Sequence, residues 1–395
     1  MQLVGRRYET AEPVSVEIAG GKISQVTPIP AEVQAQDGWP WIAPGLWDIQ
    51  INGYGGQEFS SPDLSADKVR AIVLGYGAFG VTRCCPTLFT QSFEVMQHSL
   101  RSIAAACASP EVARRIAGIH VEGPYLSPED GPRGAHPLAY CRPPDWSEFQ
   151  RFQDAADGQI RILTMAVEYE GSPQFIERVV RSGVIVGIGH TAANTEQLRA
   201  AVDAGARLST HLGNGAHATL PRHPNYLWDQ LADDRLVASL IVDGHHLPPA
   251  VVKSFLRAKT PERCILISDL SGMAGLPPGQ YRANHAEVEI LPDGRLVVAG
   301  QRQILAGASR PIGAGIANVV HFAGVSLTDA ISMAVHRPAE LLGLEAGGLE
   351  PGDPADLVQF HLAEPSDPSG PLRFEICSTV LDGEVVFGTV WQPSA

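Results

Sequence analysis

The fold is decided by residues 184–211, which read VIVGIGHTAANTEQLRAAVDAGARLSTH. Residues 184–188 form an apolar run typical of a buried strand, and residues 207–210 form a second one. Between them, residues 194–204 carry a helical pattern in which Asn194 can cap the helix, Gln197 completes a capping box and Gly205 follows the last turn. The stretch therefore predicts one strand–helix–strand unit.

The same alternation extends in both directions from this unit. Further short apolar runs occupy residues 116–121, 160–167, 238–242 and 264–268, and helical patterns separate several of them. Such repetition indicates a parallel sheet with crossover helices. A middle region of roughly 250–300 residues fits an α/β fold of the (β/α)8 TIM barrel type. A doubly wound sheet is the alternative, but no GxGxxG turn follows an early strand.

Both ends of the chain are rich in strand signals and differ from the middle. Residues 14–18 and 23–27 flank a Gly20-Gly21 turn, and residues 356–360, 375–381 and 384–390 read as three more strands. A hairpin pattern around Asp293-Gly294 interrupts the alternation and indicates an insertion.

Composition narrows the class of partner. The 395 residues carry a formal net charge of -14, so nucleic acid is not an expected partner. The N-terminus lacks the apolar segment of a secretory signal, and no apolar run reaches membrane-spanning length, so we expect a cytoplasmic protein with no membrane partner. An anionic substrate would need a locally basic pocket in so acidic a chain.

Four polar residues follow apolar runs at the points where the strands should end. They are Glu122, His190, His211 and Asp269. The carboxyl ends of barrel strands meet at one face, so these side chains should converge. Two histidines and one glutamate form a three-ligand site for a divalent metal, and Asp269 could then transfer protons. The spacing alone leaves open the alternative that the histidines are structural and that Asp269 is a cap.

Residues 43–53, APGLWDIQING, resemble the PGxxDxHxHG signature of the amidohydrolase superfamily, with Gln50 and Asn52 in place of the two histidines. This variant is similar to the N-acetylglucosamine-6-phosphate deacetylase family, and the resemblance covers nearly the whole chain. The further motifs that carry it are HVEGP at 120–124, GHT at 189–191, THLGN at 210–214, DGHH at 243–246, SD at 268–269 with AGLPPG at 274–279, and the segment 348–357.

The resemblance implies a distorted (β/α)8 barrel at residues 44–345 and a small β-sandwich domain built from residues 1–43 and 346–395. The hairpin insertion falls at about 277–305. It also implies one divalent metal per subunit, held by Glu122, His190 and His211. Because Gln50 and Asn52 are poor ligands beside imidazole, a second metal is not expected. Zinc suits this ligand set best, with iron, cobalt and manganese as alternatives.

The implied reaction removes acetate from N-acetylglucosamine 6-phosphate and leaves glucosamine 6-phosphate. Asp269 would activate the attacking water and then protonate the leaving amine, and His136, in GAHP at 134–137, would help to stabilise the oxyanion. The resemblance also implies a homodimer in which one subunit lends a phosphate-binding residue to the other. The expected substrate-binding residues are Gln50, Asn52, Asn214, Gly215, Arg222 and His246.

Two substrate-side loops depart from the family pattern. Residues 213–225 contain RHPN at 222–225 where the family has REPG, and residues 308–311 read ASRP, with Arg310, where the family has SxLT. These departures leave the substrate open. The alternatives are an amidohydrolase acting on an unphosphorylated amino sugar or an N-acyl-D-amino acid, and a sugar-phosphate-binding homologue without catalysis.

Overall fold

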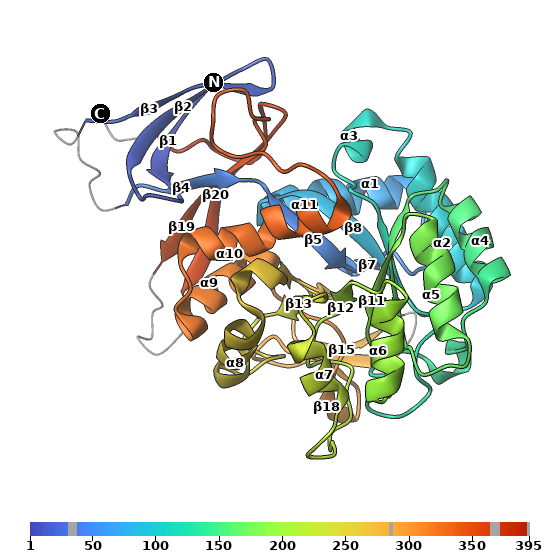
Figure 1. Cartoon of the computed structure of the whole chain (residues 1–395). Helices are drawn as coiled ribbons and strands as arrows, with labels where there is room; N and C mark the ends of the chain where they lie inside the picture. The colour runs from blue at the N-terminus through green and yellow to red at the C-terminus, as the bar shows by residue number, and fades with distance from the viewer. Residues whose placement is uncertain (31–37, 284–286, 364–371, 393–395) are drawn as a thin grey trace.

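The structure is a computed structural model that describes residues 1–30, 38–283, 287–363 and 372–392. Its centre is an eight-stranded sheet in which every neighbouring pair runs parallel (Figure 1). In pairing order the strands are β14 (Cys264–Ile267), β13 (Val237–Ile241), β12 (Leu208–Ser209), β11 (Ile185–Ile188), β10 (Ile160–Met165), β9 (Ile119–Glu122), β8 (Val81–Phe89) and β5 (Leu46–Ile51). All eight strands are largely buried, as expected of strands covered on both faces.

The first and last strands of this sheet meet and close the barrel. Ile51 forms a parallel bridge with Leu270, three residues after the end of β14. The backbone N–H of Asp269 donates to the carbonyl of Gln50, and that of Asn52 donates to the carbonyl of Leu270, each over 2.9 Å. Residues that follow β5 therefore lie beside residues that follow β14.

Helices surround the barrel and connect its strands (Figure 1). The predicted helix is confirmed as α6 (Thr195–Asp203), with Asn194 as N-cap and a capping box to Gln197. The other α-helices are α1 (Ala66–Gly75), α2 (Phe93–Ala106), α3 (Pro110–Ala113), α4 (Trp146–Ala155), α5 (Ser172–Arg181), α7 (Tyr226–Ala232), α8 (Pro249–Lys259), α9 (Ile312–Ala323), α10 (Leu327–Ala334) and α11 (His336–Leu342), and 3₁₀ helices lie at Tyr76–Phe79, Leu138–Tyr140 and Pro261–Arg263.

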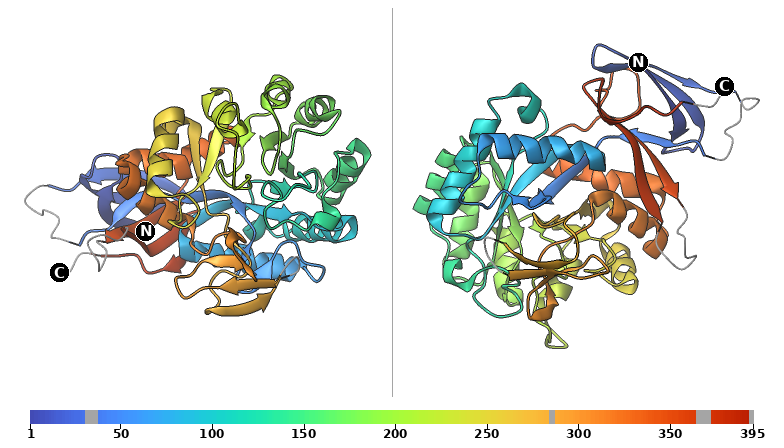
Figure 2. Two further views of the ribbon diagram at one scale, coloured as in Figure 1. Left: turned by 90° about the horizontal axis from the view of Figure 1, so that it is seen from below. Right: turned by 180° about the vertical axis from the view of Figure 1, so that it is seen from behind.

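The two ends of the chain combine in a separate seven-stranded sheet, seen as blue and red strands beside the barrel in Figure 2. β4 joins the halves, because it pairs antiparallel with β19 and parallel with β1. In order, the strands are β21 (Glu384–Gly388), β20 (Arg373–Leu381), β19 (Leu357–Ala363), β4 (Trp41–Pro44), β1 (Gln2–Arg7), β2 (Pro13–Ala19) and β3 (Lys22–Pro28).

The interruption after β14 is a four-stranded antiparallel sheet. The predicted hairpin around Asp293-Gly294 is its central pair, and one further strand flanks each side. The sheet has its own small hydrophobic cluster, which includes Val288, Ile290 and Leu296. Its strands are β15 (Gly279–Arg282), β16 (Glu287–Ile290), β17 (Leu296–Val298) and β18 (Gln301–Leu305). A separate sheet of two short antiparallel strands, β6 (Gly53–Tyr54) and β7 (Gln57–Glu58), follows β5.

The predicted fold class is thus confirmed as a barrel of eight parallel strands with a separate sheet from both termini. The domain boundaries at 43/44 and 345/346 stay predictions. None of the helices in the described ranges is both long enough and apolar enough to span a membrane.

Candidate active site

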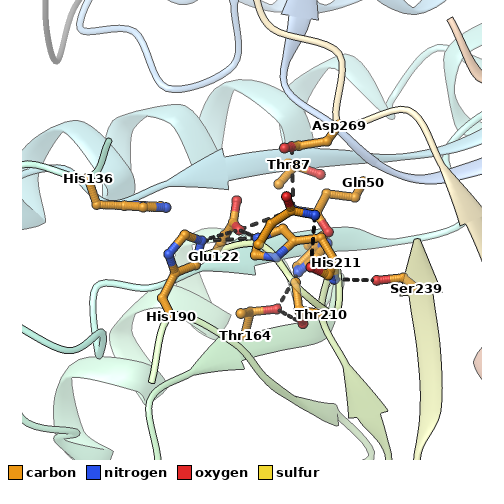
Figure 3. A network of polar contacts seen from close by, with 12 residues as sticks. Gln50, Thr87, Glu122, His136, Thr164, His190, Thr210, His211, Ser239 and Asp269 are labelled. Atoms are coloured by element: carbon orange, nitrogen blue, oxygen red, sulfur yellow. Dashed lines mark hydrogen bonds and ion pairs between the residues drawn. The ribbon is translucent and has the colours of Figure 1, made fainter. Parts of the chain in front are cut away.

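Three of the predicted strand-end residues converge on one point inside the barrel mouth. Oε1 of Glu122 lies 3.1 Å from Nε2 of His190 and 2.9 Å from Nε2 of His211, and the two Nε2 atoms lie 3.0 Å apart. All three side chains are buried. Figure 3 shows Glu122 between the two imidazoles, which approach it from β11 and β12.

The donor chemistry of these three residues fits a divalent metal. Nδ1 of His190 lies 2.8 Å from the carbonyl of Pro132, so this nitrogen carries the proton and Nε2 presents its lone pair. Ligands at about 2.1 Å from a tetrahedral metal lie about 3.4 Å from one another, close to the separations here. Nδ1 of His211 is buried and has no hydrogen-bond partner in the described part of the chain.

The backbone turns sharply at three of the four strand-end residues. His190, His211 and Asp269 have φ values of 52°, 33° and 50°, which place non-glycine residues in the left-handed region. Buried hydrogen bonds hold them there: Ser127 N–H donates to the His190 carbonyl, His211 N–H donates to Oγ of Ser239, and Ala308 N–H donates to the Asp269 carbonyl. Strain of this kind is tolerated where the surroundings fix a functional side chain.

His136 approaches the cluster from the loop after β9 (Figure 3). Glu122, His136 and His190 each offer a ligand atom, and these atoms lie within 4.8 Å of one another. However, the backbone N–H of Thr90 points at Nδ1 of His136 over 3.4 Å, so Nδ1 accepts and Nε2 carries the proton. An imidazole in this form donates a hydrogen bond and cannot ligate through Nε2. The geometry therefore favours His211 over His136 as the third ligand.

Gln50 and Asn52 surround the carboxylate of Asp269 with amide donors. Nδ2 of Asn52 donates to Oδ1 of Asp269 over 2.7 Å. Nε2 of Gln50 donates to the same oxygen over 3.4 Å and to Oε1 of Glu122 over 3.1 Å. The two amides thus lie between the carboxylates of Glu122 and Asp269, at the positions that histidines occupy in the PGxxDxHxHG signature.

The two carboxylates titrate differently. Burial, together with the negative charge of Glu122, raises the pKa of Asp269 to about 7. Burial also acts to raise the pKa of Glu122, but the close contacts with the imidazoles of His190 and His211 outweigh burial and lower this pKa well below the ordinary value. Glu122 is therefore an ionised ligand candidate, and Asp269 is a carboxylate able to exchange a proton near neutral pH.

These residues line a cavity of about 690 Å³. Of the residues predicted to bind substrate, Asn52, Asn214, Gly215 and His246 also line it, whereas Gln50 is not among the described residues of the lining. Gly215 packs against the ring of His190: a Cβ atom there would lie 2.7 Å from Nδ1. Arg222 is exposed and is not among the described residues that line the cavity, so within one chain it is not brought to the site.

A single carboxylate orients His246. Oδ2 of Asp243 lies 2.9 Å from Nδ1 of His246, and Oδ1 accepts from the backbone N–H groups of His245 and His246. This fixes the His246 ring, and no hydrogen bond to its Nε2 is found among the described residues. Burial would raise the pKa of Asp243, but the contacts with His246 lower it to about 2.

Several cavity residues were not singled out from the sequence. They come from the loop after β14 and from the inserted sheet, and include Ser271, Arg295, Arg302 and Gln303. The hairpin pattern locates the insertion, but strand periodicity does not reveal against which face it packs. Pro132 was missed as well, because its backbone carbonyl, not its side chain, orients His190.

Comparisons with known proteins identify the family of this chain. The model of the amidohydrolase family matches residues 41–386. The chain belongs to the amidohydrolase family. Among curated relatives, the N-acetylglucosamine-6-phosphate deacetylase of Bos taurus is 34% identical over 340 residues, covering 83% of this chain and 81% of that protein. The N-acetylgalactosamine-6-phosphate deacetylase of Escherichia coli O157:H7 is 32% identical over 345 residues, covering 87% and 89%.

Solved structures extend the likeness of this amidohydrolase to the whole fold. The N-acetyl-D-glucosamine-6-phosphate deacetylase of Mycobacterium smegmatis is 31% identical with a TM-score of 0.85, over 98% of this chain and 100% of that one. A mutant of that enzyme in complex with N-acetyl-D-glucosamine-6-phosphate gives 30% identity and a TM-score of 0.84, over 98% and 99%. The predicted membership in the N-acetylglucosamine-6-phosphate deacetylase branch of the family is thereby confirmed.

Proposed function

We propose that this amidohydrolase removes the N-acetyl group of an amino-sugar 6-phosphate, with N-acetylglucosamine 6-phosphate as the leading substrate. The products are glucosamine 6-phosphate and acetate. The observation that carries the proposal is the convergence of Glu122, His190 and His211 on one point beside Asp269, with the donor nitrogen of His136 across from them. That arrangement supplies a metal site, a base and an oxyanion donor in one cavity.

Glu122, His190 and His211 would hold one divalent metal, for which zinc suits the ligand set. When bound, the metal supplies Lewis-acid polarisation and lowers the pKa of water. Gln50 and Asn52 turn amide N–H groups, not lone pairs, toward Glu122 and Asp269, which supports a single metal.

Asp269 transfers the proton. Its carboxylate takes a proton from the water that attacks the acetyl carbonyl, and it gives that proton to the amine nitrogen as the C–N bond breaks. The amides of Gln50 and Asn52 hold Oδ1 in place, which leaves Oδ2 to exchange the proton. A pKa near neutrality serves both directions of transfer.

His136 stabilises the charge that develops during attack. Its Nε2–H points into the cavity and donates to the acetyl oxygen as that oxygen becomes negative. The peptide N–H of Thr90 holds the ring in this tautomer and so prepares the donor in advance.

Asn214 and Gly215 contact the sugar in this proposal, and His246 contacts the phosphate through the Nε2 that Asp243 leaves free. Because Arg222 is exposed and outside the cavity of its own chain, it would reach a phosphate across a homodimer interface. The dimer, the zinc and a cytoplasmic location remain parts of the proposal.

N-acetylgalactosamine 6-phosphate is a second candidate, since one curated relative at 32% identity is named for that substrate. The test is acetate release by the metal-loaded protein from both phosphorylated epimers and from unphosphorylated N-acetylglucosamine. We expect rapid release from a phosphorylated sugar and slow release from the plain one. Equal release from the phosphorylated and plain sugars would remove the phosphate from the proposed substrate, and no release from any of them would refute the function.

A further inference from the structure

Two loops of the barrel mouth meet at the ring of His190. One follows β9 and carries Gly134, the other follows β12 and carries Gly215, and both glycines line the cavity. A Cβ atom at Gly134 would lie 3.3 Å from Cε1 of His190, and one at Gly215 would lie 2.7 Å from Nδ1 of the same ring. The carbonyl of Pro132, on the first loop, accepts from this Nδ1 over 2.8 Å. The position of the ring therefore depends on both loops at once.

His217 joins these two loops. It lies within residues 213–225, one of the segments that depart from the family pattern, and its Nε2 lies 3.1 Å from Oε2 of Glu129 on the loop after β9. The two backbones also touch here, because a Cβ atom at Gly131 would lie 2.9 Å from Cα of His217 and 3.1 Å from the carbonyl oxygen of Ala216. Neither His217 nor Glu129 is among the described residues that line the cavity, so their contact holds the loops together without filling the space for substrate.

Tyr226 fixes the orientation of the His217 ring. The buried Tyr226 is the first residue of α7, and its hydroxyl oxygen accepts the backbone N–H of His217 over 2.8 Å. The same oxygen lies 3.0 Å from Nδ1 of His217. Because the carboxylate of Glu129 can only accept, Nε2 of His217 carries a proton, and Nδ1 of the neutral ring then accepts the hydroxyl hydrogen of Tyr226. Each ring nitrogen is thus bound to a different element of the fold.

We propose that Glu129, His217 and Tyr226 form a clasp that positions His190 for metal binding and holds the loop after β12 beside the substrate. This inference rests on the proposed function, of which the metal is a part. With the clasp open, the two loops could move apart, and the ring of His190 would lose the packing that both provide. The three residues are positioning residues, because they act through His190 and the loops. The side chain of Glu129 is 60% exposed, and exposed pairs contribute little energy, so the expected effects are moderate.

The test is the zinc dissociation constant of the protein, measured by competition with a colorimetric chelator. Glu129→Ala and His217→Leu should each weaken zinc binding about three- to tenfold, the effect of losing one hydrogen bond. His217→Gln should recover most of the loss, because its amide nitrogen can still donate to Glu129. The double variant that combines Glu129→Ala with His217→Leu should lose no more than the larger single loss, since both changes open the same contact.

The matched control is an ion pair away from the cavity. Asp203, at the end of α6, accepts from Arg235 over 2.7 Å, both side chains are exposed, and neither is among the described residues of the lining. Asp203→Ala should leave zinc binding unchanged.

Acetate release provides a second measurement. With saturating zinc, Glu129→Ala should raise KM for N-acetylglucosamine 6-phosphate more than it lowers kcat, because the loop after β12 carries the proposed sugar contacts of Asn214 and Gly215. A loss confined to kcat would contradict the second role of the clasp, which is to hold this loop beside the substrate.

An unchanged zinc dissociation constant in Glu129→Ala, which removes an exposed side chain and leaves the core intact, would overturn the proposal. Additive losses in the double variant, or an equal loss in Asp203→Ala, would overturn it as well. Weakened zinc binding in the clasp variants of a protein that releases no acetate would support the clasp and refute the proposed function. Normal acetate release with unchanged zinc binding in the same variants would refute the clasp alone.

Discussion

Asn52 donates from Nδ2 to Oδ1 of Asp269 over 2.7 Å, and this bond joins the residue after the first barrel strand to the second residue after the last. The amide neutralises no charge, but it fixes which oxygen of Asp269 faces the protein. The other oxygen is then oriented toward substrate. Asn52 is therefore expected to act on turnover through Asp269, without binding the metal.

Asn52→Asp should lower kcat about ten- to a hundredfold at neutral pH, within the range expected for a disturbed general base. A new carboxylate beside Asp269 would raise the pKa of Asp269, so the acidic limb of the kcat–pH profile should move to higher pH. Asn52→Leu is the control, since it removes the hydrogen bond without adding charge. An unshifted acidic limb in Asn52→Asp would contradict the role given to this pair.

The metal content should be one ion per subunit. Glu122→Gln and His211→Ala should lose stoichiometric metal, as measured by elemental analysis, and lose activity by a factor of about 10³ or more. Gln50→Ala should retain one ion, because its amide donates to Glu122 and does not ligate. Two ions in the wild type, or loss of the ion in Gln50→Ala, would show that the amides belong to the metal site.

Asp269→Asn should keep the metal and the fold but reduce turnover by about 10³-fold, since it removes the proton acceptor and leaves the shape intact. Metal analysis and circular dichroism should match the wild type. Turnover close to the wild-type rate in this variant would show that a group other than Asp269 transfers the proton.

His136 should contribute as a donor and not as a ligand. His136→Ala is expected to lower kcat about 10²–10³-fold while the metal content stays at the wild-type level. His136→Gln, whose amide N–H reaches nearly as far as Nε2, should recover part of that loss. Metal loss in His136→Ala would instead support the alternative ligand set of Glu122, His136 and His190.

Asp48 should make stability depend on pH. It is buried in β5, its Oδ1 accepts from the backbone N–H groups of Gln50 and Ser268, and burial raises its pKa to about 7 from an ordinary 3.8. A raised carboxyl pKa stabilises the fold below pH 3.8, and this contribution is lost as pH rises through 7.

Between pH 5 and pH 8 the loss amounts to roughly 2–3 kcal/mol for the shift cited. Asp48→Asn keeps an accepting oxygen and removes the titration. Chemical unfolding of the metal-loaded protein should therefore show the variant gaining stability relative to the wild type over that interval. A constant difference between the two proteins across the interval would refute this assignment.

The convergence of the residues at the strand ends was predictable from the sequence, because a barrel brings the carboxyl ends of its strands to one face. Glu122, His190, His211 and Asp269 each follow a short apolar run, and parallel strands bring their carboxyl ends to one face. The capping box of α6 was equally predictable, since it depends on residues three positions apart. Both signals are local.

The contacts around these residues were not predictable in the same way. That Gln50 and Asn52 direct their amides at Asp269 depends on barrel closure, which no local pattern encodes. Arg222 matches a spacing in the family, yet its position depends on the path of an irregular loop. His245 and Arg295 line the same cavity because of how the inserted sheet packs, and strand periodicity predicts a hairpin there without its orientation.

Closure of the barrel also sets the order in which function can arise during folding. Gln50 and Asp269 are separated by 219 residues, and their contact forms where the last strand meets the first. Contacts so distant in sequence form late and slowly. A chain still emerging from the ribosome could bring His190 and His211 together before Asp269 has reached its place beside Gln50. In a refolding reaction, the time at which acetate first appears would then report when the first and last strands of the barrel pair.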